Sequence, residues 1–239
     1  MPISIAENRD NMEAMREFPD KFFDLAVVDP PYGIGASTAA FIRKGKQTGK
    51  SLCKSGVRYN AKSWDSAVPD SEYFKELNRV SANQIVWGGN YFGLPASGCW
   101  IVWDKDNGEN LYADCELAWT SFSSAVRKFE FKWHGMLQQD MSNKESRIHP
   151  TQKPVALYKW LLTNYAKPGD KILDTHLGSG SSRIAAYDMG FDFWGYELDA
   201  DYFADEEARF QAHISKPVLF APEQMYRFEQ AELFTPENL

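Results

Sequence analysis

Four consecutive residues, Asp29-Pro30-Pro31-Tyr32, are suited to holding a planar heterocycle. Two successive prolines lack backbone N–H groups and fix φ, so we expect a rigid, extended segment with free carbonyl oxygens. The Asp29 carboxylate and the Pro30 carbonyl can then accept the two hydrogens of an exocyclic amine, while the Tyr32 ring stacks on the heterocycle. The alternative interpretation is a strand terminus followed by a surface turn and a packed tyrosine.

A second group of residues has the spacing of a nucleotide-cofactor site. The turn Gly178-Ser179-Gly180 follows an apolar run that ends at Asp174, and Glu197 stands 17 positions after the last glycine. Glycines let a ligand approach the backbone, and an acid at this distance is placed to accept from ribose hydroxyls. A dinucleotide site would have a third glycine where this chain has Arg183, and a G-x-G sequence also occurs in ordinary tight turns.

Strands and helices must bring these two groups together. Short apolar runs predict buried strands at 24–28, 84–87, 99–103, 171–174 and 193–197. Apolar spacing and composition predict helices at 155–165, 181–189 and 199–214. A strand–helix–strand unit implies a parallel pair, and the alternation predicts an α/β, Rossmann-like, doubly wound, mostly parallel sheet with helices on both faces. Ligands are then expected outside the carboxyl ends of the strands.

Composition places the chain among folded globular proteins. Its 239 residues are 44% apolar and 15% aromatic, which fits one catalytic domain at 1–215 followed by a tail at 216–239. No run approaches 18 apolar residues, and the start MPISIAENRD lacks the features of a signal peptide, so we expect a cytoplasmic protein with no membrane partner. Three cysteines and four histidines lack metal-ligand spacing, so we expect reduced thiols and no metal.

The charge is unevenly distributed along the chain. The net charge is −7, yet the stretch between Gly33 and Trp64 contains seven basic residues and no acidic one. The long loop at 37–63 is therefore predicted to be a local site for a polyanion. The residues predicted to contact this polyanion are Arg43, Lys44, Lys46, Lys50, Lys54 and Arg58. The alternative is a solvated loop without contacts.

Together the two groups resemble the DNA amino-methyltransferases that use S-adenosyl-L-methionine, in the order, called the beta class, where the catalytic motif precedes the cofactor motif. The stretch Ile148-His149-Pro150-Thr151-Gln152-Lys153-Pro154 looks like the HPTQKP element of that family, and Asn8-Arg9-Asp10 is similar to its N-G-D. Trp64-Asp65 and Trp87-Gly88-Gly89-Asn90-Tyr91 fit a phage- and prophage-like branch. The resemblance covers roughly residues 3–209 and implies a circularly permuted methyltransferase fold.

This resemblance implies a role for each matching residue. Asp29, Pro30, Pro31 and Tyr32 would form the base-methylation site. Asp10 would meet the cofactor adenine, Glu197 its ribose, and Gly178, Ser179 and Gly180 would pass beneath it. Thr151, Gln152 and Lys153 would lie near the methionine end, where Lys153 would face the carboxylate, and Asp174 completes the predicted cofactor set. The chain departs from the family pattern at Asp174-Thr175-His176, where Asp-Pro-Phe is usual, and at Arg9, which replaces a glycine.

The implied activity is methyl transfer to the exocyclic N6 of adenine in DNA, without a metal. Because a base inside a duplex cannot reach such a site, the target must be flipped out and stacked, here on Tyr32. The nearest alternative is N4-cytosine methylation, although family members that act on cytosine more often show Ser-Pro-Pro-Tyr. Two further alternatives are a catalytically silent DNA-binding module and a nicotinamide-dependent oxidoreductase.

Two segments bear on partners. Larger family members carry a target-recognition region before HPTQKP, but here the segment 121–147 has only 27 residues. Sequence readout is therefore expected to be short, to be shared with the basic loop, or to come from a second subunit of a homodimer. In the tail, Gln230, Leu233 and Phe234 resemble the peptide by which bacterial proteins bind the sliding clamp, and chance resemblance is the alternative.

Overall fold

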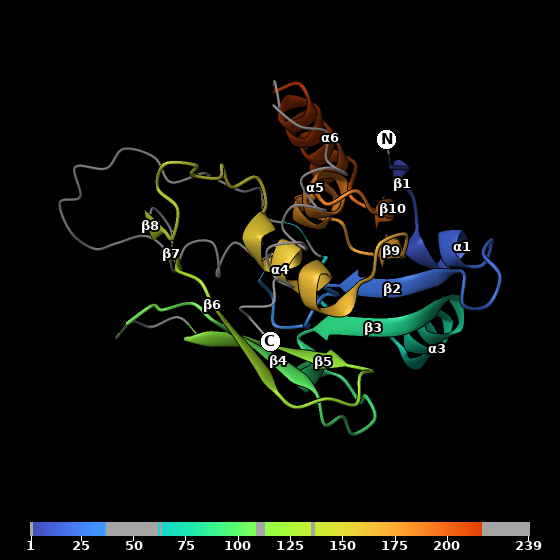
Figure 1. Ribbon diagram of the computed structural model, residues 1–239. Coiled ribbons are helices and arrows are strands. Elements are labelled where there is room, and N and C mark those ends of the chain that lie inside the picture. The colour runs from blue at the N-terminus through green and yellow to red at the C-terminus, as the bar shows by residue number, and fades with distance from the viewer. Residues whose placement is uncertain (1, 37–61, 63, 109–112, 135–136, 217–239) are drawn as a thin grey trace, which may run out of the picture.

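The computed structural model describes residues 2–36, 62, 64–108, 113–134 and 137–216. Eight of its strands form one sheet in the order β1-β10-β9-β2-β3-β5-β4-β6 (Figure 1). Five neighbouring strands run parallel: β1 (Ser4–Asn8), β10 (Asp192–Glu197), β9 (Lys171–Asp174), β2 (Phe23–Val28) and β3 (Ser81–Trp87). The sheet continues through β5 (Cys115–Thr120), β4 (Trp100–Asp104) and β6 (Arg127–Glu130), while β7 (Trp133–His134) and β8 (Leu137–Gln138) form a separate pair.

Helices cover both faces of the sheet because side chains along a strand point alternately to either face. From β2, Leu25 and Val27 pack in a cluster with α4 (Val155–Tyr165) and α5 (Ser181–Asp188). Ala26 and Val28 pack in a second cluster with α1 (Asn11–Met15) and α3 (Ser71–Val80). Burial on both faces explains why β2 is continuously apolar from Leu25 to Val28. The last helix, α6 (Ala200–Ile214), packs on α5, β1 and β10 (Figure 1).

The predicted fold class is confirmed. The five predicted strands and three predicted helices are present with ends shifted by at most three residues, and β9 and β10 are parallel, as the strand–helix–strand pattern predicted. The sequence analysis missed β1, β5, β6, α1 and α3. Of these, β5 runs antiparallel to both β3 and β4, and its exposed first residue and half-buried second and third residues give no clear apolar pattern.

Some predicted elements lie outside the described residues. One is the basic loop apart from Lys62, and with it the predicted DNA-binding residues Arg43, Lys44, Lys46, Lys50, Lys54 and Arg58. The other is the tail from 217, with Gln230, Leu233 and Phe234. Within the described residues, no helix combines the length and apolar character needed to cross a bilayer.

Candidate active site

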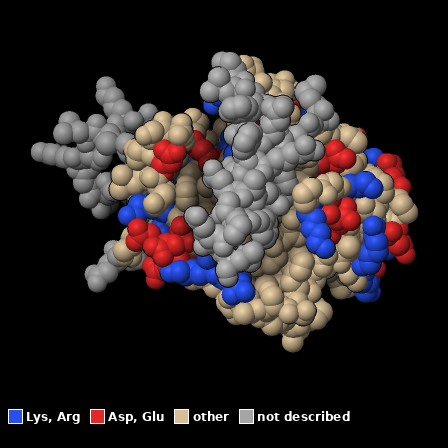
Figure 2. Space-filling model, viewed as in Figure 1, with Lys and Arg blue, Asp and Glu red and all other residues tan. Residues whose placement is uncertain are grey.

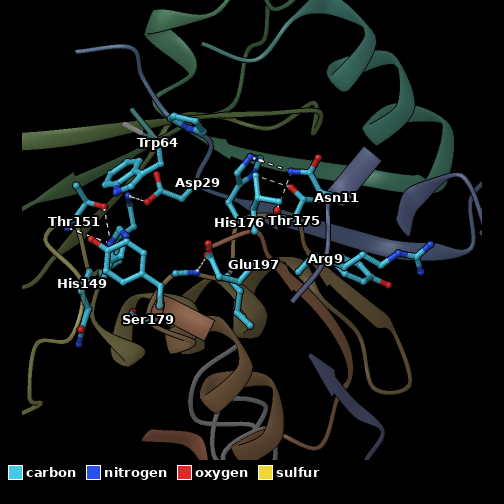
Figure 3. Close-up of a pocket in the computed structure, with 18 of the residues that line it drawn as sticks. Arg9, Asn11, Asp29, Trp64, His149, Thr151, Thr175, His176, Ser179 and Glu197 are labelled. Atoms are coloured by element: carbon cyan, nitrogen blue, oxygen red, sulfur yellow. Dashed lines mark hydrogen bonds and ion pairs between the residues drawn. The ribbon is translucent and has the colours of Figure 1, made fainter. Parts of the chain in front are cut away.

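The carboxyl ends of the parallel strands bring the two predicted groups to one edge of the sheet. Ala26 on β2 is opposite Leu173 on β9, and Asn8 at the end of β1 is opposite Glu197 at the end of β10. Asp29 follows β2 directly and therefore emerges at the same edge. A cleft of about 210 Å³ opens there. In Figure 3, Asp29 and Glu197 both border this cleft although 168 positions separate them in the sequence.

Both carboxylate oxygens of Asp29 have hydrogen-bond partners. The Tyr32 hydroxyl donates to Oδ1 at 2.6 Å, and the Lys153 ammonium donates to Oδ2 at 2.5 Å. The Lys153 side chain is only 2% exposed and also lies 3.1 Å from a Glu116 carboxylate oxygen. Lys105 contacts the other oxygen of Glu116 at 2.5 Å, so the four charged groups form a continuous chain.

Burial and neighbouring charges act on this chain in opposite directions. Burial raises the pKa of Asp29, Lys153 lowers it and Glu116 raises it, and the net direction is upward. Burial also raises the pKa of Glu116, but Lys153 and Lys105 outweigh it and bring that pKa down to about 2. Burial lowers the pKa of Lys153, yet the two carboxylates raise it above the ordinary lysine value. Lys153 and Glu116 are therefore both charged at neutral pH.

The Tyr32 ring lies in a narrow aromatic slot. Its ring stacks on that of Tyr91, with centroids 5.0 Å apart and planes 13° from parallel. Gly88 packs against the same ring, because a Cβ added there would lie 2.1 Å from a Tyr32 ring carbon. Gly88 also has φ +69°, which favours glycine. A matched glycine and tyrosine thus set the orientation of the predicted base-stacking ring.

A buried carboxylate holds the turn that follows Tyr32. Asp65 accepts hydrogen bonds from the backbone N–H groups of Gly33 at 2.8 Å and Ala36 at 2.6 Å, and its carbonyl accepts from Gly35 at 3.1 Å. These contacts join the two described ends of the basic loop. At the far end of the loop, Lys62 pairs with Asp199 and Asp201 beside the start of α6.

The glycine turn is tied to the acid at the end of β10. The backbone N–H of Gly178 donates to Glu197 Oε2 at 2.8 Å, and that of Asp199 donates to Oε1 at 2.8 Å. Burial raises the pKa of Glu197. Each oxygen keeps a second lone pair, so the carboxylate can still accept from a ligand hydroxyl. Asp10 is similar: one oxygen caps α1 by accepting from Glu13 N–H at 3.0 Å, and its side chain borders the cleft.

The cleft includes nine of the thirteen predicted catalytic and cofactor residues, namely Asp10, Asp29, Pro31, Thr151, Gln152, Lys153, Gly178, Ser179 and Glu197. Pro30, Tyr32, Asp174 and Gly180 do not line it. Pro30 is buried, and Tyr32 stacks on Tyr91 while its hydroxyl donates to Asp29. A Cβ at Gly180 would meet Glu206 at 2.4 Å, so this glycine serves helix packing.

Three of the predicted cofactor residues have partners within the protein. Asp174 is 1% exposed and accepts from His176 N–H at 3.0 Å and from the Ser182 hydroxyl at 2.5 Å, so it shapes the turn from inside. Burial raises the pKa of Asp174 to about 7. The Gln152 amide is also used internally, accepting from Ile148 N–H at 2.9 Å. Lys153 was predicted to face the ligand carboxylate, and its ammonium contacts two protein carboxylates, those of Asp29 and Glu116.

Several cleft residues were not predicted. His176 is one of them: it stands where the family usually has phenylalanine, and its Nδ1 lies 3.0 Å from the Thr175 hydroxyl. Burial lowers its pKa to about 4, so the ring is neutral at pH 7. The same departure from the family pattern that was noted in the sequence could have marked it. Asn11, directly after the predicted Asp10, lies within 3.2 Å of its Nε2.

An aromatic wall closes the other end of the cleft. His149 lies between Trp64, at a centroid distance of 5.1 Å, and Tyr202, at 4.3 Å. Burial lowers the pKa of His149 to about 3, so this ring is neutral as well. His149 and Trp64 belong to motifs that were recognised in the sequence, but Tyr202 on α6 had no such signal. Among the described residues, no cluster of three or more His, Cys, Asp or Glu is arranged to hold a metal.

Sequence comparison gives a match for the later part of the chain, which includes the glycine turn and Glu197 but not Asp29. Residues 102–208 match one protein-family model. That model is N6_N4_Mtase, described as a DNA methylase. The chain is 23% identical over 234 residues to the DNA adenine methyltransferase YhdJ of Escherichia coli (strain K12), covering 81% of this chain and 78% of the relative. It is 23% identical over 249 residues to the Type II methyltransferase M.HinfI of Haemophilus influenzae, covering 84% and 66%, respectively. The matched model is thus described as a DNA methylase, and both relatives are named as methyltransferases.

Solved structures share the fold. The PvuII DNA methyltransferase, described as cytosine-N4-specific, has a TM-score of 0.53 at 15% identity and covers 97% of this chain and 94% of its own. TTHA0409 of Thermus thermophilus, a putative DNA modification methylase complexed with S-adenosyl-L-methionine, has a TM-score of 0.51 at 17% identity and covers 92% and 96%. The fold is therefore the Rossmann-like fold of these methyltransferases.

Proposed function

We propose that this protein transfers a methyl group from S-adenosyl-L-methionine to the exocyclic N6 of adenine in DNA. The observation that carries the proposal is the placement of Asp29 and the Glu197–Gly178 turn on one cleft, at the carboxyl ends of adjacent strands. The DNA methylase match and the adenine-specific relative support the same reaction. Ligands of open α/β sheets bind at this edge.

The cleft residues fit the proposed cofactor. Glu197 retains lone pairs for ribose hydroxyls, and Asp10 retains one uncapped carboxylate oxygen for an adenine amine. Both histidines of the cleft are neutral, so neither opposes a positively charged sulfonium. In Figure 3, Asp29 and Trp64 lie at one end of the cleft and Arg9 and Asn11 at the other, with Glu197 between them. An elongated nucleoside ligand suits this order. The bound cofactor supplies an electrophilic methyl group.

Protein residues would activate the base by orientation and electrostatics. The N6 lone pair of adenine is delocalised into the ring, which makes the amine a poor nucleophile. A hydrogen bond from N6–H to Asp29 favours a more tetrahedral nitrogen and frees the lone pair to attack in line. Asp29 can do this only as a carboxylate, and Lys153, 2.5 Å away, stabilises that ionised form. Tyr32 would stack on the flipped base.

The distribution of charged side chains on the face drawn in Figure 2 supports the proposal that the predicted basic loop contacts the DNA backbone. In Figure 2, basic and acidic side chains lie next to one another over the described part of this face. Some surface charges are paired with one another, for example Lys128 with Glu130 at 2.8 Å. The predicted loop lysines and arginines at 43–58, by contrast, have no acidic neighbour in the sequence. The same proposal includes the assignment to the beta class and its phage-like branch. It also includes a catalytic domain at 1–215 with a tail at 216–239, and a homodimer.

The test is product analysis. The purified protein, S-adenosyl-L-methionine and mixed-sequence DNA are incubated together, and the modified nucleosides are identified by mass spectrometry, with flanking sequences obtained by methylation-sensitive sequencing. N6-methyladenine is expected. N4-methylcytosine without N6-methyladenine would overturn the adenine assignment, and the fold of the PvuII enzyme makes this the second candidate. Saturable binding of NAD in preference to S-adenosyl-L-methionine would overturn the cofactor assignment.

A further inference from the structure

The Lys153 ammonium is held between two carboxylates that come from different strands. Asp29 follows β2 and Glu116 lies on β5, two strands away in the sheet. The ammonium lies 2.5 Å from Asp29 Oδ2 and 3.1 Å from Glu116 Oε2, and its side chain is 2% exposed. A second cation, Lys105, neutralises Glu116 from its outer side. Two carboxylates and two ammonium groups thus form a charge-balanced, half-buried row in which Lys153 is the buried member.

This arrangement matters because Asp29 has no oxygen without a donor. Tyr32 donates to one oxygen and Lys153 to the other. An incoming amine must therefore share an oxygen with one of these donors or displace it. Displacing the ammonium would leave a buried charge without a partner, which is strongly unfavourable, unless another acceptor is already in reach. Glu116 is such an acceptor.

We propose that Glu116 is a positioning residue for the methyl-transfer reaction, acting through Lys153: it retains the ammonium when the target amine takes an Asp29 oxygen, and keeps it beside Asp29 otherwise. The inference rests on the proposed function. According to this inference, Lys153 interacts with the Asp29 carboxylate and not with the carboxylate of the cofactor. Through Glu116, strand β5 then takes part in the reaction.

The charged groups around Asp29 determine whether each substitution raises or lowers the pKa of Asp29. Glu116 opposes ionisation of Asp29 and Lys153 favours it, so their removal should move the pKa of Asp29 in opposite directions. The other groups that face or act on Asp29 come from its own loop, α3, α4, and β9: Tyr32, Tyr73, Tyr158 and Asp174. Because these groups are common to all variants below, they do not affect the direction of the comparison.

The experiment measures single-turnover methyl transfer from about pH 5 to 9, which covers ionisation of a carboxylate with a raised pKa. The variants are Glu116→Gln and Lys153→Met, with Glu116→Asp as a charge-preserving variant. Lys128→Met is the matched control, since Lys128 pairs with exposed acids on the surface of the same sheet. Thermal melting and S-adenosyl-L-methionine affinity are measured for each.

We expect both Glu116→Gln and Lys153→Met to slow methyl transfer about tenfold or more. The acid limb of the pH–rate profile, which is the fall in rate as Asp29 becomes protonated, should shift by about 1 pH unit, downward in Glu116→Gln and upward in Lys153→Met. Glu116→Asp should keep the wild-type limb, and cofactor affinity should stay within about twofold throughout, because the network is assigned to Asp29. If Glu116→Gln does not fold, Lys105→Met replaces it: unneutralised Glu116 should then raise the Asp29 pKa and move the limb upward.

Slower transfer with unchanged acid limbs would reduce the network to a structural role and overturn the inference. So would a cofactor affinity that falls about tenfold or more in Lys153→Met with no limb shift, which would assign the ammonium to the cofactor. Wild-type protein that binds the cofactor and methylates no DNA would overturn the proposed function itself, and this result is obtained before any variant is compared.

Discussion

Gly88→Ala should displace Tyr32 and slow methyl transfer without removing any catalytic atom. An added Cβ would lie 2.1 Å from a Tyr32 ring carbon, far inside van der Waals contact. The ring therefore has to leave its stack on Tyr91, and its hydroxyl loses the 2.6 Å hydrogen bond to Asp29. Because the proposed base-stacking surface moves while the cofactor residues stay in place, the effect should fall on the DNA step.

The stability change has three parts. A non-glycine residue in the left-handed region costs about 1–2 kcal/mol. Loss of a hydrogen bond to a charged group costs about 1.5–3 kcal/mol, and loss of an aromatic stack costs about 0.5–1.5 kcal/mol. Gly108→Ala is the matched control, because Gly108 has φ +64° and, among the described residues other than its chain neighbours, no atom lies within 4 Å of an added Cβ. Only the first cost applies to Gly108.

Thermal melting and steady-state kinetics test this difference. Each kcal/mol corresponds to about 2–4 °C in Tm for a domain of this size. We expect Gly108→Ala to melt a few degrees below wild type with full activity. Gly88→Ala should melt lower still and lose the base-stacking contribution of about 1–3 kcal/mol, a fall of about 5- to 150-fold in kcat/KM for DNA. Cofactor affinity should be unchanged. Equal melting points and equal activities for the two variants would refute the close contact between Gly88 and Tyr32.

Three further predictions follow from the sequence motifs. Asp29→Ala should abolish methyl transfer and leave cofactor binding within a few-fold, because the carboxylate is proposed to act on the base amine; turnover within a few-fold of wild type would contradict this. Neutralising Lys44, Lys46 and Lys50 together should weaken DNA binding and flatten its salt dependence, measured by titration at several salt concentrations, since phosphate contacts release counterions in proportion to their number; an unchanged salt slope would indicate a loop without contacts. The full chain should bind the host sliding clamp in calorimetric titration and a chain ending at Glu229 should not; equal binding by both, or none by either, removes that hypothesis.

Local sequence determined much of the framework. The apolar run before Asp29 can be buried only as a strand between neighbours, and the two prolines end its pairing because they have no N–H to donate. The strand–turn–helix pattern from 171 to 189 likewise fixed β9, the glycine turn and α5, because glycine at positive φ and a helical apolar period are local properties. These features placed the predicted residues at strand ends.

Only the tertiary structure decided the partners of those residues. Lys153 contacts Asp29 across 124 positions and Glu116 across 37, and nothing local distinguishes it from a lysine that faces a ligand. The same holds for Asp65, which holds a turn 29–32 positions earlier, and for Tyr202, which reaches His149 from α6. Such contacts depend on strand order, register and the packing of helices on both faces. A buried charge takes whichever opposite charge the fold brings within reach, because leaving it unpaired costs more than any local preference provides.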